Sequence, residues 1–217
     1  MKRTLICLGI VLLGLLCTAR AAAPERQVAD NRVISRSDPE VTIEVPSSAK
    51  YLGADRWDLY GLADCEIHVF AEAVNGRLEA VYWIQFESIL PSQPTSQYAY
   101  WSDELVTISG MYFNRRTHFG PTHELPKAAS DNERVRHLLE RAGYELPADI
   151  MSVRLVHLTD ETYRKELMIV YIEDLAATGH TSAQLMDGDK PVLAWEGIRS
   201  DFLRRAQKRI RISDWRR

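Results

Sequence analysis

The dipeptide Asn75-Gly76 lies between two runs of alternating residues and constrains this 217-residue chain more than any other stretch. Asn-Gly favours a two-residue type I′ turn, because both central residues of that turn need positive φ. Such a turn predicts a β-hairpin over residues 64–90, in which one register puts the apolar side chains on a single face. The expected pairs are Ala73 with Leu78, Ala71 with Ala80, Val69 with Tyr82, Ile67 with Ile84, and Cys65 with Phe86. The same register sets Glu72 against Glu79, and like charges in opposition speak mildly against it.

Other stretches rich in β-forming residues predict further strands over 41–45, 98–101, 105–113, 151–158 and 167–172. The last of these is a continuous apolar run, which is typical of a strand that is covered on both faces. Gly110 indicates a bulge or a close contact within its strand. Residues 114–124 predict a polar loop, and the pattern of residues 51–62 does not decide their structure.

Two helices are predicted from local patterns. Ser130 followed by Glu133 forms a capping box, and Gly143 is placed to end a helix over residues 131–142. A second helix over residues 194–210 has a broad apolar face opposite a basic one. Together the elements predict one α+β domain over residues 39–213, an antiparallel sheet of about five to seven strands with both helices packed on it.

The N-terminus resembles an export signal in its charge and hydropathy. A short basic region precedes an apolar run of 13 residues, Leu5 to Cys17, and Ala19-Arg20-Ala21 offers an A-x-A cleavage site. The run is shorter than the roughly 20 residues that a membrane-spanning helix needs. We therefore expect a signal peptide over residues 1–21, cleaved near Ala21, and a flexible leader over residues 22–38. A retained anchor and a lipoprotein attached through Cys17 are the alternatives.

Export changes the meaning of the cysteines and of the charge. Cleavage removes Cys7 and Cys17, so Cys65 alone remains and no internal disulfide can form. The remaining chain has 24 basic and 30 acidic residues, a net charge of −6 with histidine neutral. Its last 19 residues nevertheless hold eight basic and two acidic side chains. The sequence thus predicts an acidic body with a basic C-terminal helix.

Candidate catalytic residues are few and none belongs to a recognised motif. His118 and His123 share the predicted loop, and Asp160 and Glu161 lie in a charged turn between two predicted strands. A histidine with an acid could perform general acid–base chemistry. The spacing lacks the H-E-x-x-H pattern and the chain lacks a cysteine pair, so neither a metal nor a cofactor is predicted. We interpret these four residues as solvated groups, and a His/acid hydrolase as an alternative.

The basic face of the C-terminal helix offers a different possibility. Arg204, Lys208 and Arg211 could contact an anionic membrane surface. The simpler interpretation is a solvated face that balances the acidic body, and that acidity disfavours nucleic acid as a partner. The leading hypothesis is therefore a periplasmic or secreted, non-enzymatic protein that binds a small molecule or an envelope protein. A hydrolase and a membrane-surface protein remain the alternatives.

Overall fold

A computed structural model describes residues 23–100, 104–122 and 126–214. Seven strands form an antiparallel main sheet in the order β4-β5-β6-β10-β9-β8-β7. In chain order they are β4 (Lys50–Leu59), β5 (Ala63–Val74), β6 (Arg77–Ile89), β7 (Glu104–Ile108), β8 (Met111–Pro121), β9 (Asp149–Leu158) and β10 (Lys165–Asp174).

A smaller sheet joins the two ends of the described chain. Its order is β1-β2-β3-β13, with β1 (Gln27–Ala29), β2 (Arg32–Arg36), β3 (Glu40–Glu44) and β13 (Arg211–Ser213). Two short strands, β11 (Met186–Asp187) and β12 (Lys190–Pro191), pair with each other. The helices are α1 (Asp131–Arg141) and α2 (Ala194–Arg209), with the 3-10 turns η1 (Leu175–Thr178) and η2 (Ala183–Leu185). None of the described helices is long and apolar enough to span a membrane.

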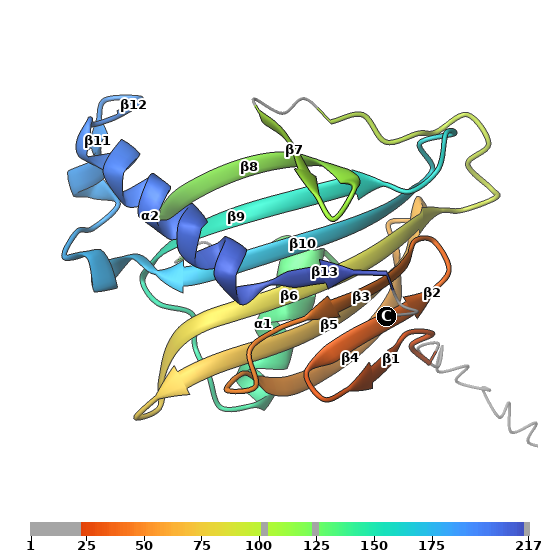
Figure 1. Ribbon diagram of the computed structural model, residues 1–217, viewed down its shortest axis with the longest axis horizontal. Helices are drawn as coiled ribbons and strands as arrows, with labels where there is room; N and C mark the ends of the chain where they lie inside the picture. Colours follow the sequence, from red (N-terminus) through yellow and green to blue (C-terminus); the bar gives the residue numbers. More distant parts are fainter. Residues whose placement is uncertain (1–22, 101–103, 123–125, 215–217) are drawn as a thin grey trace, which may run out of the picture.

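The main sheet is covered on both faces, as Figure 1 shows. Helix α1 lies behind it, whereas α2 and the smaller sheet lie in front. Each side has its own buried core: Val135, Leu138 and Leu139 of α1 belong to one, and Trp195 and Phe202 of α2 to the other. This architecture confirms the predicted α+β fold with two packed helices. It also explains the apolar run of β10, which contributes to both cores.

The predicted hairpin exists, but most of its predicted register is wrong. Asn75 and Gly76 form the turn at positive φ, and Ala73 pairs with Leu78 as expected. A bulge at Glu79 then shifts the pairing by one residue, so that Val69 lies opposite Trp83 and Phe70 opposite Tyr82. Because both faces are buried, the apolar pattern could not select one register.

The bulge also removes the like-charge pair that the sequence had indicated. Glu72 lies opposite Ala80 instead of Glu79. Its carboxylate accepts a hydrogen bond from the Tyr82 hydroxyl at 2.8 Å and forms an ion pair with Arg209 of α2. A pairing that would have been repulsive becomes an attachment point for the C-terminal helix.

Several other predictions need correction. The expected flexible leader includes two strands, β1 and β2, whose inward residues Val33 and Ser35 are buried. The strand predicted over 105–113 is two strands, because Ser109 and Gly110 adopt positive φ and turn the chain. Much of the predicted loop over 114–124 belongs to β8. Tyr98 to Tyr100 form no strand, and residues 51–59 belong to β4.

Both predicted helices are confirmed. The Ser130 hydroxyl accepts from the Glu133 backbone N–H at 3.3 Å, and the Glu133 carboxylate accepts from the Ala129 N–H at 2.6 Å. Gly143 follows α1 with φ of +80°. Helix α2 buries Trp195, Phe202 and Ala206 before the chain enters β13. The helix is thereby held at its C-terminal end by the smaller sheet.

Candidate functional site

Helix α2 lies across the front of the main sheet and leaves a cleft on each side. Phe202 stacks on Tyr171 of β10, with their ring centroids 5.6 Å apart, and this contact fixes the middle of the helix on the sheet. Tyr171 lines both clefts. The two clefts differ in the chemistry of their walls.

The apolar cleft lies between α2 and the β7–β8 hairpin and has a volume of about 580 Å³. Its floor consists of Val153, Leu155 and Ile169 from the main sheet. Apolar walls come from the hairpin and from the end of α2 with β13: Val106, Ile108, Leu203, Ala206, Ile210 and Ile212. A cavity of this size and character is typical of small-molecule sites.

Among the described residues, the charged side chains that line the apolar cleft are two arginines, Arg115 and Arg204, and no acid. Arg115 donates from Nε to Glu104 at 2.6 Å, while Arg199 donates to the same carboxylate at 2.5 Å. These contacts lower the pKa of Glu104, and Arg199 also lies 3.8 Å from Glu196. The charged side chains that face the cleft itself are positive, so the cleft favours an acidic ligand.

Polar contacts hold the apolar cleft open at both ends of the hairpin. At the tip, the Ser109 hydroxyl donates to the Ile212 carbonyl at 2.6 Å, which ties the hairpin to β13. Near the other end, Arg199 of α2 donates from Nε to the Thr117 hydroxyl at 2.8 Å in addition to its contact with Glu104. The walls are therefore fixed before any ligand enters, which reduces the entropy that binding would cost.

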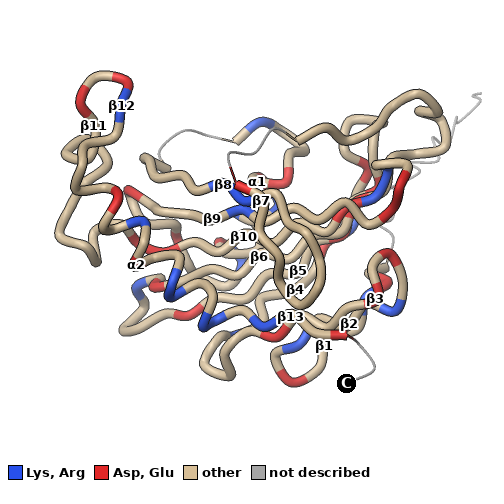
Figure 2. Tube along the Cα trace, turned by 45° about the horizontal axis from the view of Figure 1, so that its top comes forward, with Lys and Arg blue, Asp and Glu red and all other residues tan. Residues whose placement is uncertain are grey.

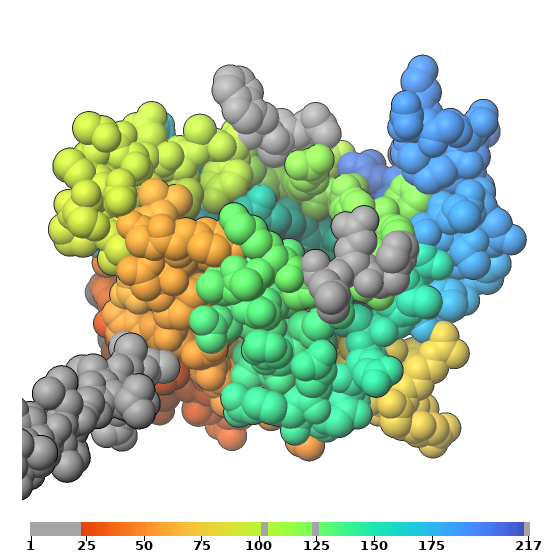
Figure 3. Space-filling model, turned by 180° about the vertical axis from the view of Figure 1, so that it is seen from behind, coloured from red at the N-terminus to blue at the C-terminus, as the bar shows by residue number. Residues whose placement is uncertain are grey.

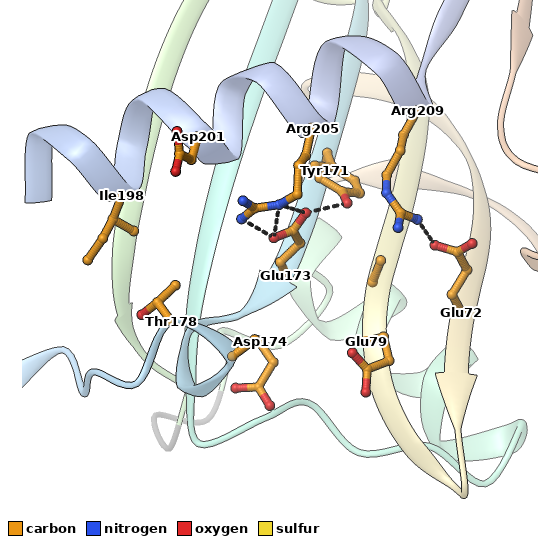
Figure 4. Close-up of a pocket in the computed structure, with 12 residues that line it drawn as sticks. Glu72, Glu79, Tyr171, Glu173, Asp174, Thr178, Ile198, Asp201, Arg205 and Arg209 are labelled. Carbon is orange, nitrogen blue, oxygen red and sulfur yellow. Dashed lines mark hydrogen bonds and ion pairs between the residues drawn. The ribbon is translucent and has the colours of Figure 1, made fainter.

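The polar cleft lies on the other side of α2 and has a volume of about 450 Å³ (Figure 4). Arg205 donates to Glu173 at 2.7 Å, the Tyr171 hydroxyl donates to Glu173 at 2.6 Å, and Arg209 pairs with Glu72. Burial, followed by the charge of Glu173, raises the pKa of Tyr171. Each arginine of this cleft is already bound to a carboxylate, so these contacts attach α2 to the sheet.

A third polar group lies on the opposite face of the sheet. Glu87 and Glu166 are directly opposed on β6 and β10, and both side chains are buried. The Tyr98 hydroxyl donates to Glu87 at 3.1 Å, and the Tyr100 hydroxyl donates to Glu166. Burial and the charge of Glu87 raise the pKa of Glu166 to about 8, and burial raises that of Glu87.

The predicted histidine–acid site does not assemble from the residues described. His118 lies on β8 opposite Ser152 of β9, and Asp160 comes eight residues after Ser152. At about 3.3 Å per residue the two are separated by roughly 26 Å along the sheet. Asp160 instead accepts the Arg164 backbone N–H at 3.0 Å, and hydrogen bonds to the turn lower its pKa. Glu161 lies in the same turn, and His123 lies outside the described residues.

Among the predicted surface cations, Arg204 alone lines the apolar cleft. Arg211 forms a long ion pair of 3.7 Å with Glu44, and Lys208 is exposed on α2. Sequence reasoning missed the other cleft residues because they come from segments far apart in the chain. The Ser109-Gly110 dipeptide, which favours a turn between two β-rich runs, was the signal that could have revealed the hairpin wall.

Within the described ranges, no group of three or more histidine, cysteine or acidic side chains is arranged to hold a metal ion. The chain has no match among protein-family models, curated proteins or solved structures. Its function therefore has to be inferred from the clefts of this fold and from the residues that line them.

Proposed function

We propose that this protein is exported and, without catalysing a reaction, binds a small amphipathic anion in the apolar cleft. The observation that supports this most is the combination of an apolar floor with charged lining residues that are all arginine. An apolar chain on Val153, Leu155 and Ile169 would leave water, and this is the main driving force for such ligands. The hydrolase alternative has less support because His118 and Asp160 lie at opposite ends of the sheet.

The acidic end of the ligand would lie near Arg115 and Arg204. Arg204 pairs with Asp201 at 2.7 Å, but both side chains are about 60% exposed, at 62% and 60%. An ion pair so exposed contributes little and can be exchanged for a ligand carboxylate. Arg115 donates to Glu104 through Nε, so its terminal amino groups can donate to a further anion.

Titration with dodecanoate, followed by isothermal calorimetry, tests this proposal. We expect saturable binding, with dodecanol binding more weakly because it lacks the charge. Ser200→Trp fills the mouth of the cleft from an exposed position of α2 and should weaken dodecanoate binding by roughly tenfold or more. The matched control is Ala194→Trp, an exposed position of the same helix outside the cleft.

Failure of dodecanoate to saturate the protein, or equal binding by the two tryptophan variants, would contradict the proposal. Native mass spectrometry of protein purified from its host without detergent offers a second measure, since a retained ligand adds mass.

Attachment to an anionic membrane surface through α2 is the competing proposal, and Figure 2 shows several basic segments along that helix. The two proposals differ in the residues they need. The affinity of a ligand in the cleft depends on Arg204 and not on Lys208, whereas binding to an anionic membrane surface would depend on both charges equally. Arg204→Gln and Lys208→Gln, compared for dodecanoate binding and for sedimentation with anionic vesicles, separate them.

A further inference from the structure

The face of the sheet opposite α2 carries a pair of arginines that oppose each other directly. Arg116 of β8 is the register partner of Arg154 of β9. Side chains alternate between the two faces of a strand. Arg115 and Thr117, on either side of Arg116 in the chain, face α2, where they contact Glu104 and Arg199. Arg116 and its partner Arg154 therefore face the α1 side. Like charges directly opposite each other in a sheet are destabilising. The arrangement therefore needs a reason other than stability.

Within the described residues, neither arginine of this pair forms a close ion pair, although most other arginines of the fold do. The charge of Arg154 acts on Glu166, whose pKa it lowers against the larger effect of burial. The nearby carboxyls of Glu87 and Glu166 are buried and are bound by tyrosine hydroxyls. Their raised pKa values keep this carboxyl pair from supplying two full negative charges at neutral pH.

Arg154 is held in one orientation. Its guanidinium carbon lies 5.0 Å from the centre of the Tyr100 ring, and its Nε donates to the Met168 sulfur at 2.8 Å. Tyr100 in turn is fixed by its hydrogen bond to Glu166. These contacts use Nε and one face of the guanidinium, and the two terminal amino groups make no hydrogen bond to another described residue. A guanidinium held in this way is pre-organised to bind an oxyanion in a forked geometry.

The pKa of His118 reflects the positive potential beside Arg116. Its ring packs along the strand toward Gly120, where an added methyl would lie 3.0 Å from Nε2. Partial desolvation, followed by the charge of Arg116, lowers the pKa of this histidine. A neighbouring carboxylate would have the opposite effect.

We propose that Arg116 and Arg154 bind a doubly charged oxyanion of the phosphate type on the α1 face. Two guanidinium groups match the charge of a phosphate dianion. They also offer more N–H donors than the two oxygens of one carboxylate can accept, which favours the additional oxygens of a phosphate. Figure 3 shows this face hollowed between α1 and the yellow-green segment of residues 90–100. The ligand chemistry is that of a phosphomonoester, whether it belongs to a soluble molecule or to a lipid headgroup.

This site does not depend on the proposed apolar cleft, because the sheet separates the two. Arg115 lines the apolar cleft and Arg116 faces the other side. Failure of one proposal therefore leaves the other standing, and each can be tested in the same protein.

Inorganic phosphate is the first probe, added to the full chain while the His118 ring is followed by NMR. We expect a saturable change, with the pKa of His118 rising as the bound anion offsets the charge of Arg116. Arg116→Gln and Arg154→Gln should each weaken phosphate binding by at least about tenfold. Arg211→Gln, an exposed arginine on the smaller sheet, is the matched control and should bind as the parent does.

Thermal unfolding gives a second readout that a purely structural role would not produce. Without phosphate, Arg116→Gln should not lower the melting temperature, because it removes a repulsion. Phosphate should raise the melting temperature of the parent and of Arg211→Gln but not that of Arg116→Gln. An equal rise in all three proteins, or an equal rise with sodium chloride at the same ionic strength, would overturn the proposal.

Two further probes distinguish the sources of the anion. Methyl phosphate that binds in an Arg116-dependent way supports a soluble phosphomonoester. Arg116-dependent binding to vesicles containing phosphatidic acid, with no response to methyl phosphate, supports a lipid headgroup. Vesicle binding that Arg116→Gln leaves unchanged would count against a lipid ligand at this site.

Discussion

At the scale of single residues, the buried carboxyl pair shows how the sheet changes the chemistry of ordinary side chains. Glu166 is 1% exposed and lies directly opposite Glu87. One of its oxygens has no hydrogen-bond partner in the part of the chain that the structure describes, while the other accepts from Tyr100. Two charged carboxylates in this position would repel each other in a medium that solvates them poorly, so the pair retains a proton.

This proton makes stability depend on pH. The pKa of Glu166 is about 8 in the folded protein, well above the 4.5 of an unperturbed side chain. Between these values the folded state holds a proton that the unfolded state releases, so stability should fall as pH rises from about 4.5 to about 8. The fall due to this group cannot exceed about 1.4 kcal/mol per pH unit.

Urea denaturation at several pH values measures the effect. Glu166→Gln replaces the acid with a neutral group of the same shape and should flatten the decline. Glu161→Gln, a carboxylate in the nearby turn, is the control and should leave it unchanged. A Glu166→Gln protein that loses stability with pH as steeply as the parent would contradict this assignment.

At the scale of elements, the hairpin β5–β6 depends on one inserted residue. Glu79 allows Tyr82, Ile84 and Phe86 to face α2 and the smaller sheet, while Trp83 faces α1. Deleting Glu79 would remove the bulge and leave every pair from Glu72–Ala80 onward in its present register. Deleting Gln85 would instead draw Glu79 into the ladder and exchange the faces of residues 79–84, so that their side chains would meet the wrong core.

We therefore expect deletion of Gln85 to cost more than about 4 kcal/mol and to prevent stable folding. Deletion of Glu79 should leave a stably folded protein, because the pairing on both sides of the bulge is kept. Circular dichroism and chemical denaturation of the two variants test the comparison. A Gln85 deletion protein as stable as the Glu79 deletion protein would contradict this account of the register.

The same element shows where sequence reasoning succeeds and where it fails. The α1 cap and the Asn75-Gly76 turn were predictable because their signals lie within a few adjacent residues. The bulge was not, because it satisfies two cores that only the assembled fold creates. The apolar cleft and the opposed arginines escape prediction for a related reason: the sequence pattern predicts one strand and a loop where β7 and β8 lie, so the pairing of β8 with β9 does not follow from it.

At the scale of the whole molecule, the two ends of the described chain meet in one sheet. Strand β13 follows α2 and pairs with β3 from the N-terminal part. Ile212 of β13 is 6% exposed and lines the apolar cleft, and its carbonyl accepts the Ser109 hydroxyl. The C-terminal strand thus joins the smaller sheet, α2 and the hairpin wall into one side of the protein.

This arrangement predicts that core truncations on the two faces of the main sheet differ in their effect on dodecanoate binding, although both lower stability. Ile212→Ala should cost about 2–5 kcal/mol and should also weaken dodecanoate binding, because the wall of the cleft loses its fixed position. Leu138→Ala removes a comparable buried side chain from α1, on the other face. It should cost a similar amount of stability while leaving dodecanoate binding intact.

Chemical denaturation and calorimetry on both variants measure the two effects. Equal losses of dodecanoate binding would mean that the cleft depends on overall stability, and the α2 face could no longer be treated as a binding unit of its own.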